Sequence, residues 1–104
     1  MNLIGRDELK ERLDRNEEMK LVMVLGEWAY RAAHIPGSLR FDAIEEPLGP
    51  DDQIVVYDSN PRCVASLRAY KRLENRGYGH VRRYAGGLED WADAGHALEG
   101  ELVG

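Results

Sequence analysis

The sequence predicts an α/β domain in which helices cover both faces of a parallel sheet. Two short apolar runs, "LVMVL" (21–25) and "IVVY" (54–57), are rich in β-branched residues and bounded by turn residues, as buried parallel strands are. Segments with helical periodicity alternate with them and are long enough for crossover connections. The length of 104 residues allows one domain, residues 1–104, with a single core.

The first half of the chain begins with a charged helix. "RDELKERLDRNEE" (6–18) places Leu9 and Leu13 at i, i+4, which predicts a solvated amphipathic helix with one apolar stripe. After the strand at 21–25, we expect a short helix over "EWAYRAA" (27–33) and a turn over "HIPGS" (34–38). The segment "LRFDAIEEPLGPDD" (39–52) predicts a small strand, a helical turn and a Pro/Gly break.

The second half continues the alternation after a loop at 58–63. "CVASLRAYKRLENRGY" (63–78) predicts a helix that stops near Gly77. We expect "HVRRY" (80–84) to form a strand and "AGGLEDWADAG" (85–95) to form a glycine turn and a short helix. The apolar stripe predicted for the helix at 63–78 consists of Val64, Leu67, Tyr70 and Leu73.

Composition excludes several classes of protein. The formal charge of −5, from 14 Lys and Arg against 19 Asp and Glu, argues against a nucleic-acid binder. No apolar run is longer than "LVMVL", so we expect no membrane span, and "MNLIGRDELKERL" lacks the regions of a secretory signal. The single cysteine cannot form an internal disulfide, and we predict a cytoplasmic location.

The junction "IVVYDSNPRCVAS" (54–66) is the strongest candidate for a site. Asp58 is the first residue after the strand, and Cys63, the one thiol, follows five positions later. Ligands of parallel sheets bind beyond the carboxyl ends of the strands, and the N–H groups of a loop and of a helix N-terminus attract anions. We therefore predict an anion-binding loop formed by Ser59, Asn60, Pro61, Arg62, Cys63 and Val64.

Three blocks of sequence together resemble a single rhodanese (sulfurtransferase) domain. "AYRAAHIPGSLRF" (29–41) resembles the family's N-terminal signature around a Gly-His-Ile-Pro-Gly-Ala segment. "IVVYDSNPRCVASLRAYKRLENRGYGHVRRYAGG" (54–87) resembles its active-site strand, loop, helix and next strand. "GGLEDWADAGHALEG" (86–100) resembles its closing helix and tail. The resemblance implies a five-stranded parallel sheet with helices on both faces.

The chain departs from the family pattern at two places. The family's nucleophile is a cysteine directly after the active-site strand, and Asp58 stands there in this chain. The strand before the "HIPG" block usually carries Asp-Val-Arg, and here it carries Met23-Val24-Leu25. The loop keeps its length, and Cys63 lies at its far end, where some members have a second cysteine.

A carboxylate cannot replace the thiolate chemically. Sulfur transfer needs a soft atom that forms a persulfide, whereas carboxylate oxygens are hard and weakly nucleophilic. We interpret Asp58 as a loop carboxylate that caps the following helix and holds the loop closed, which leaves no sulfur transfer through position 58. The sharper alternative is Asp58 as a nucleophile of the aspartyl-phosphate kind, but Asp51 and Asp52 lie at the other end of the strand.

Cys63 and Arg62 each have two interpretations. Cys63 is either an ordinary small residue in a first helical turn or a thiol whose thiolate form is favoured by the helix dipole and by Arg62. Arg62 is either solvated surface or an anion clamp.

The other chemically active side chains favour structural roles. We expect His34 to fix the "HIPG" turn, and no pair among His34, His80 and His96 has metal-ligand spacing. Trp28 and Trp91 are predicted to pack in the core. Gly86 and Gly87 lack the rest of a phosphate-loop signature and predict a tight turn. We expect neither a metal nor a cofactor.

Three functions are therefore open. The first is a non-catalytic rhodanese-like binding or regulatory module that meets a protein partner or a small anion. The second is a sulfurtransferase or persulfide carrier that uses Cys63, and the third is a phosphoryl-handling protein that uses Asp58.

Overall fold

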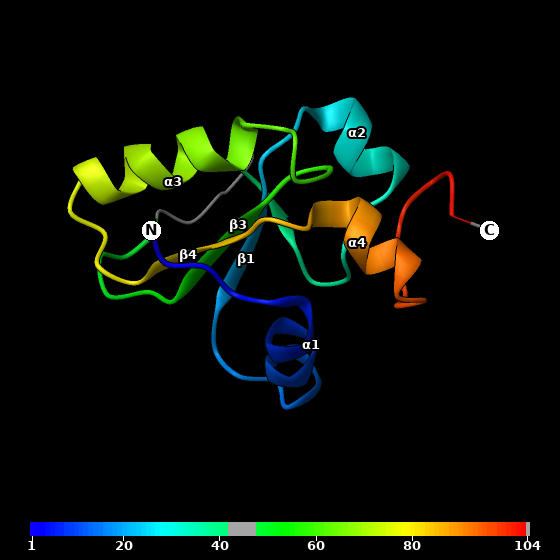
Figure 1. Cartoon of the computed structure of the whole chain (residues 1–104), viewed down its shortest axis with the longest axis horizontal. Coiled ribbons are helices and arrows are strands. Elements are labelled where there is room, and N and C mark those ends of the chain that lie inside the picture. The colour runs from blue at the N-terminus through cyan, green and yellow to red at the C-terminus, as the bar shows by residue number, and fades with distance from the viewer. Residues whose placement is uncertain (42–47, 104) are drawn as a thin grey trace.

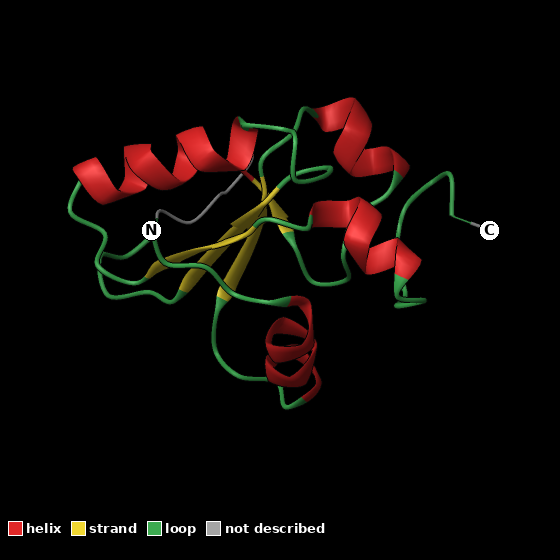
Figure 2. Ribbon diagram, in the orientation of Figure 1, coloured by secondary structure: helices red, strands yellow, loops and turns green. Residues whose placement is uncertain are grey.

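Four parallel strands form the centre of the domain, and helices lie on both of its faces (Figures 1 and 2). The computed structural model describes residues 1–41 and 48–103. Along the described chain the elements are α1 (Arg6–Asp14), β1 (Lys20–Met23), α2 (Glu27–Ala32), β2 (Leu39–Arg40), β3 (Ile54–Tyr57), α3 (Ala65–Asn75), β4 (Val81–Tyr84) and α4 (Gly87–Asp93).

The sheet has the strand order β2-β1-β3-β4, and every pairing is parallel. Beyond β4, Leu3 forms an isolated parallel bridge with Arg83, supported by hydrogen bonds from Ile4 N to Arg83 O (3.1 Å) and from Arg83 N to Asn2 O (2.9 Å). The predicted α/β class with a parallel sheet is confirmed. The described residues form four strands where the resemblance implies five, and the Leu3–Arg83 bridge adds a single-residue pairing beyond β4.

Both faces of the sheet are buried at its centre, which explains why β3 and the last three residues of β1 are continuously apolar. Successive side chains of a strand point to opposite faces, so β1, β3 and β4 each supply residues to two cores. One core, beneath α1 and α4, contains Leu9, Leu21, Met23, Val55, Tyr57, Tyr84 and Trp91. The other, beneath α3, contains Val22, Ile54, Val56, Ala69, Tyr70, Leu73 and Val81. Figure 1 shows α3 on one side of the sheet and α1 on the other.

The helix predicted at the start of the chain is confirmed by the burial of its leucines. Leu9 is fully buried and Leu13 packs against the core beside it, while the charged residues of α1 face solvent. The segment 42–47, where a helical turn was expected, lies outside the described residues. In the described part of the chain, no helix is both long and apolar enough to cross a membrane.

The apolar stripe predicted for the helix at 63–78 is confirmed at Tyr70 and Leu73, but it is wrong at Val64, and Leu67 is half-buried and belongs to neither core. The helix begins at Ala65, so Val64 lies before it and is 47% exposed. The face that α3 buries contains two small residues, Ser66 and Ala69, next to Tyr70 and Leu73. The buried face of α3 therefore includes small side chains, which the predicted stripe of large apolar residues did not contain.

The prediction for the two tryptophans is right for one and wrong for the other. Trp91 is buried, and its Nε1–H donates to Ala97 O at 3.1 Å. Trp28 is 80% exposed. The short helix α2 packs Ala29 and Tyr30 against the core, which turns Trp28 in its first turn toward solvent.

Candidate functional site

The loops that follow the central strands meet at one edge of the sheet. Met23, Tyr57 and Tyr84 are aligned in the register of β1, β3 and β4, so the segments after them emerge side by side. The loop 58–64 lies in the middle of this edge, between the first turn of α3 and α4 (Figure 1). The parallel topology therefore places the predicted loop where ligands of such sheets bind.

Asp58 is completely buried in this loop. Its Oδ2 accepts a hydrogen bond from the backbone N–H of Ser66 at 2.8 Å, and its side chain has no exposed surface. Ser66 lies in the first turn of α3, whose N–H groups have no partner inside the helix, and Val64 at the N-cap position makes no side-chain bond. Asp58 thus caps α3 from a position outside the helix, as the capping interpretation predicts.

The second carboxylate oxygen of Asp58 has an unusual environment. Oδ1 is buried and makes no hydrogen bond within the part of the chain that the structure describes. A buried polar atom without a partner lowers stability by ~1–3 kcal/mol, so this oxygen offsets part of what the Ser66 contact contributes. The donor that the carboxylate does use comes from α3 and not from the loop itself.

The loop satisfies two of its own N–H groups through Asn60. The Asn60 Oδ1 accepts hydrogen bonds from Arg62 N at 2.9 Å and from Cys63 N at 3.2 Å. Cys63 N also approaches Asn60 O at 3.1 Å, which closes a tight turn around Pro61. Because these donors are used internally, they contribute less to binding an external anion than the sequence led us to expect. Pro61 and the Arg62 side chain are exposed, and Cys63 is partly exposed.

The start of α4 holds the first residues of the loop by their carbonyl groups. Leu88 N donates to Asp58 O, and Glu89 N donates to Ser59 O, both at 2.9 Å. Gly87 makes this approach possible, because a Cβ at that residue would lie 2.5 Å from Asp58 O and its φ is +69°. The predicted turn at Gly86-Gly87 therefore lets the start of α4 contact the backbone of the loop.

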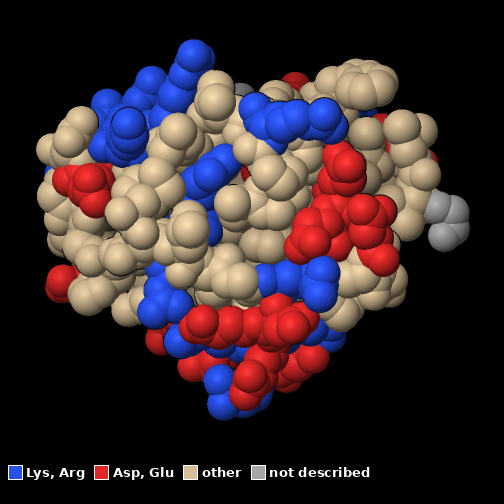
Figure 3. All heavy atoms as spheres, viewed as in Figure 1, with Lys and Arg blue, Asp and Glu red and all other residues tan. Residues whose placement is uncertain are grey.

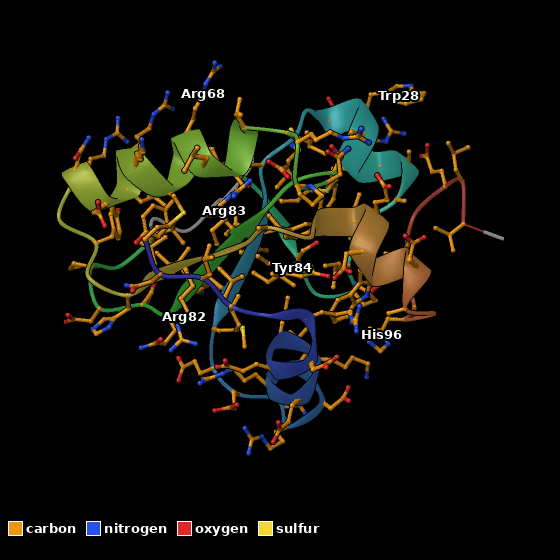
Figure 4. All side chains as sticks on the ribbon, in the orientation of Figure 1. Trp28, Arg68, Arg82, Arg83, Tyr84 and His96 are labelled. Atoms are coloured by element: carbon orange, nitrogen blue, oxygen red, sulfur yellow. The ribbon has the colours of Figure 1, made fainter. Side chains whose placement is uncertain are left out.

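Arg83 of β4 joins the far end of the loop to α3 (Figure 4). Its Nε donates to Ser66 Oγ at 2.8 Å and its Nη2 donates to Cys63 O at 3.2 Å. The Ser66 hydroxyl therefore accepts a hydrogen bond from Arg83, while the Ser66 backbone N–H donates one to Asp58. The guanidinium therefore contacts the far end of the loop directly at Cys63 and is linked to Asp58, at the near end, through Ser66.

The "HIPG" segment is built around two tyrosines. The Tyr57 hydroxyl donates to Ser38 Oγ at 2.8 Å and accepts from Ile35 N at 3.0 Å, and its burial raises the pKa of Tyr57 to about 12. His34 stacks on Tyr30 with ring centroids 4.0 Å apart, and its Nδ1–H donates to Tyr30 O at 2.8 Å. These contacts confirm a turn-fixing role for His34.

Tyr84 ends β4 beside the same edge of the sheet. Its hydroxyl donates to Asp90 Oδ2 at 2.6 Å, and Arg6 Nη1 contacts the other oxygen of Asp90 at 3.2 Å. Burial, followed by the Asp90 carboxylate, raises the pKa of Tyr84 above its usual range. Within the described residues, no group of three His, Cys, Asp or Glu side chains is arranged to hold a metal ion.

Sequence reasoning found Asp58 and Cys63 but missed Ser66 and Arg83. One signal for Arg83 was available: it lies two positions after Val81 in a strand, and alternation places both on the face covered by α3. An arginine on a buried face needs polar partners, and Ser66 with the Cys63 carbonyl supplies them. Ser66 gave no signal of its own.

Comparison with known proteins gives one family and a consistent fold. The family model of the rhodanese-like domain matches residues 5–94. No curated protein sequence matches the chain.

Several solved structures have the same fold. The BH2092 protein of Bacillus halodurans superimposes with a TM-score of 0.87 at 24% identity, over 97% of this chain and 78% of its own. The rhodanese-like domain of Alr3790 from Anabaena has a TM-score of 0.84 at 25% identity, over 98% of this chain and 81% of its own. The human single-domain sulfurtransferase TSTD1 has a TM-score of 0.77 at 20% identity, over 89% of this chain and 96% of its own.

Proposed function

This chain belongs to the rhodanese-like domain family, and we propose that it is a binding module in which Asp58 occupies the nucleophile position and closes the active-site loop. The observation that carries this proposal is the complete burial of Asp58, with Oδ2 held by the Ser66 N–H at 2.8 Å. A carboxylate used as a helix cap is not presented to a substrate. In this proposal the loop is part of a surface that binds a partner and does not carry out catalysis.

The chemistry of sulfur transfer predicts that this arrangement is inactive toward thiosulfate. In the reaction a thiolate attacks the sulfane sulfur, a sulfur–sulfur bond forms, and the bond to the sulfonate breaks so that sulfite leaves with the electron pair. Asp58 has no sulfur to form that bond, and removal of a nucleophile lowers turnover by up to ~10⁶-fold in other enzymes. The contacts of Leu88 and Glu89 to the loop carbonyls also keep the loop from opening around a donor.

A second candidate function uses Cys63 as a persulfide carrier. Its support is position: Cys63 is partly exposed at the end of the loop, beside the exposed Arg62. The Cys63 carbonyl is fixed by Arg83, which leaves the side chain as the free part of the residue. A phosphoryl-handling role for Asp58 has less support, because that mechanism needs an exposed carboxylate oxygen and Asp58 is fully buried.

Intact-mass spectrometry after exposure to thiosulfate separates these functions. We expect the wild-type protein to gain no sulfur and to show no thiosulfate:cyanide turnover above buffer. A gain of one sulfur atom that disappears in Cys63→Ser would support the carrier function instead. A gain that persists in Cys63→Ser, or turnover in that variant, would contradict the binding-module proposal, since the chain has no second cysteine.

A further inference from the structure

The outer face of α3 carries four exposed basic side chains, and the one exposed carboxylate of the same helix, Glu74, forms no ion pair with any of them. We define the basic face as the exposed side chains Arg68, Lys71, Arg72 and Arg76. They lie on one side of the helix, opposite the buried Ser66, Ala69, Tyr70 and Leu73. Figure 3 shows Lys and Arg atoms gathered over α3, and in Figure 4 Arg68 points away from the sheet.

The other helices neutralise their basic side chains by a different arrangement. Each basic side chain of α1 and α2 has a carboxylate nearby, and i, i+4 ion pairs join Lys10 to Asp14, Arg12 to Glu8, Arg15 to Glu11 and Arg31 to Glu27. Within the described residues, no member of the basic face forms an ion pair. The basic side chains of α1 and α2 therefore have carboxylate partners, whereas those of the basic face are exposed and form no ion pair within the described residues.

The spacing within the basic face is unfavourable for the isolated helix. Arg68, Arg72 and Arg76 follow one another at i, i+4, so like charges are neighbours along the surface of the helix. An anionic partner that covers this face would turn the repulsion into attraction. In a chain with a net charge of −5, such a local excess of cations also orients an approaching anionic partner.

We propose that the basic face is the docking surface for an acidic protein segment, a short run of Asp and Glu residues. The inference rests on the proposed function and gives the binding module a partner class. The four cations cover roughly 12 Å of helix at ~1.5 Å per residue, which matches about four residues of extended chain. A spread of this kind suits an extended polyanion better than one small anion.

The surroundings of the basic face favour protein over nucleic acid. Single-stranded nucleic acid is bound by aromatic side chains that stack on its bases, and the exposed large hydrophobic side chains of the described chain include none on α3. The exposed aromatic residue Trp28 belongs to α2. Val64 and Arg62, both exposed, lie in the chain between the loop and the first turn of α3.

Fluorescence anisotropy with a labelled octaglutamate peptide tests this inference. We expect binding at ~0.01 M salt that weakens strongly at ~0.15 M, because the Debye length falls from ~30 Å to ~8 Å. The double variant Arg68→Ala/Arg72→Ala should bind about tenfold more weakly. The matched control Lys10→Ala/Arg15→Ala has the same net charge and lies on α1 and at its C-cap, and it should change the affinity by less than about twofold.

Three results would overturn the assignment. They are the absence of octaglutamate binding at low salt, equal losses in the two double variants, and tighter binding of an oligothymidine of equal charge than of the peptide. Sedimentation of the wild-type protein adds a fourth: self-association that Arg68→Ala/Arg72→Ala abolishes would make a second copy of the chain the occupant. None of these readouts depends on sulfur chemistry, so a failure here is distinguishable from a sulfur gain in the thiosulfate experiment.

Discussion

Replacing Asp58 with alanine should lower the free energy of unfolding by about 1 kcal/mol. The variant removes the hydrogen bond from Ser66 N to Oδ2 at 2.8 Å and leaves an N–H in the first turn of α3 without its cap. Loss of a cap costs ~0.5–2 kcal/mol. The variant also removes the buried, unpartnered Oδ1, which offsets part of that loss and argues for the middle of the range.

Urea denaturation followed by far-UV circular dichroism measures this effect. With a slope of ~1–3 kcal/mol per molar urea, a loss of ~1 kcal/mol lowers the midpoint by roughly 0.3–1 M. Asp58→Asn is the matched control, because an amide oxygen can still accept from Ser66 N and no charge remains buried. It should lose less stability than Asp58→Ala.

Two results would refute the reasoning. An unchanged or higher midpoint for Asp58→Ala would show that the contact with Ser66 contributes nothing to stability. Equal losses for Asn and Ala would show that the charge of Asp58, and not its role as an acceptor, is what stabilises the loop.

Three further predictions follow from the same edge of the sheet. In a Cys63→Ser background, Asp58→Cys should gain the mass of one sulfur atom from thiosulfate while turnover with cyanide stays low; a folded variant without the gain would mean that the loop does not support a thiolate. Gly87→Ala should lower the urea midpoint far more than Gly79→Ala, because a Cβ at Gly87 meets Asp58 O at 2.5 Å whereas one at Gly79 meets nothing within 4 Å; equal midpoints would contradict the close approach. Because the folded-state pKa of Tyr57 is raised to about 12 from 10.0, the tyrosine contributes stability that is present below pH ~10 and lost as the pH rises to about 12. Tyr57→Phe should show a shallower loss over that interval, and parallel curves would refute a buried neutral phenol.

Local patterns in the sequence were sufficient for the fold class. The continuous apolar runs at 21–25 and 54–57 predicted strands buried on both faces, and both are central strands of a parallel sheet. The spacing of Leu9 and Leu13 predicted the amphipathic helix α1. These features depend on periodicity over a few residues, which one chain displays without any knowledge of its tertiary contacts.

The candidate site was located by the sequence but not explained by it. The position of Asp58 after a strand placed it at the ligand-binding edge of the sheet, and its capping role was a reasonable expectation. Trp28 was expected in the core and is exposed, because the direction of a side chain on a six-residue helix depends on what that helix packs against.

The tertiary structure alone decided how the loop is held. Asp58 meets Ser66 eight positions later, Arg83 reaches back to Ser66 and Cys63 across seventeen and twenty positions, and Gly87 touches the loop from the start of α4. Local sequence specifies the preferences of the backbone and the apolar faces of helices and strands. The partner of a buried carboxylate or guanidinium depends on which distant segments the sheet brings together, and that information exists only once the chain has folded.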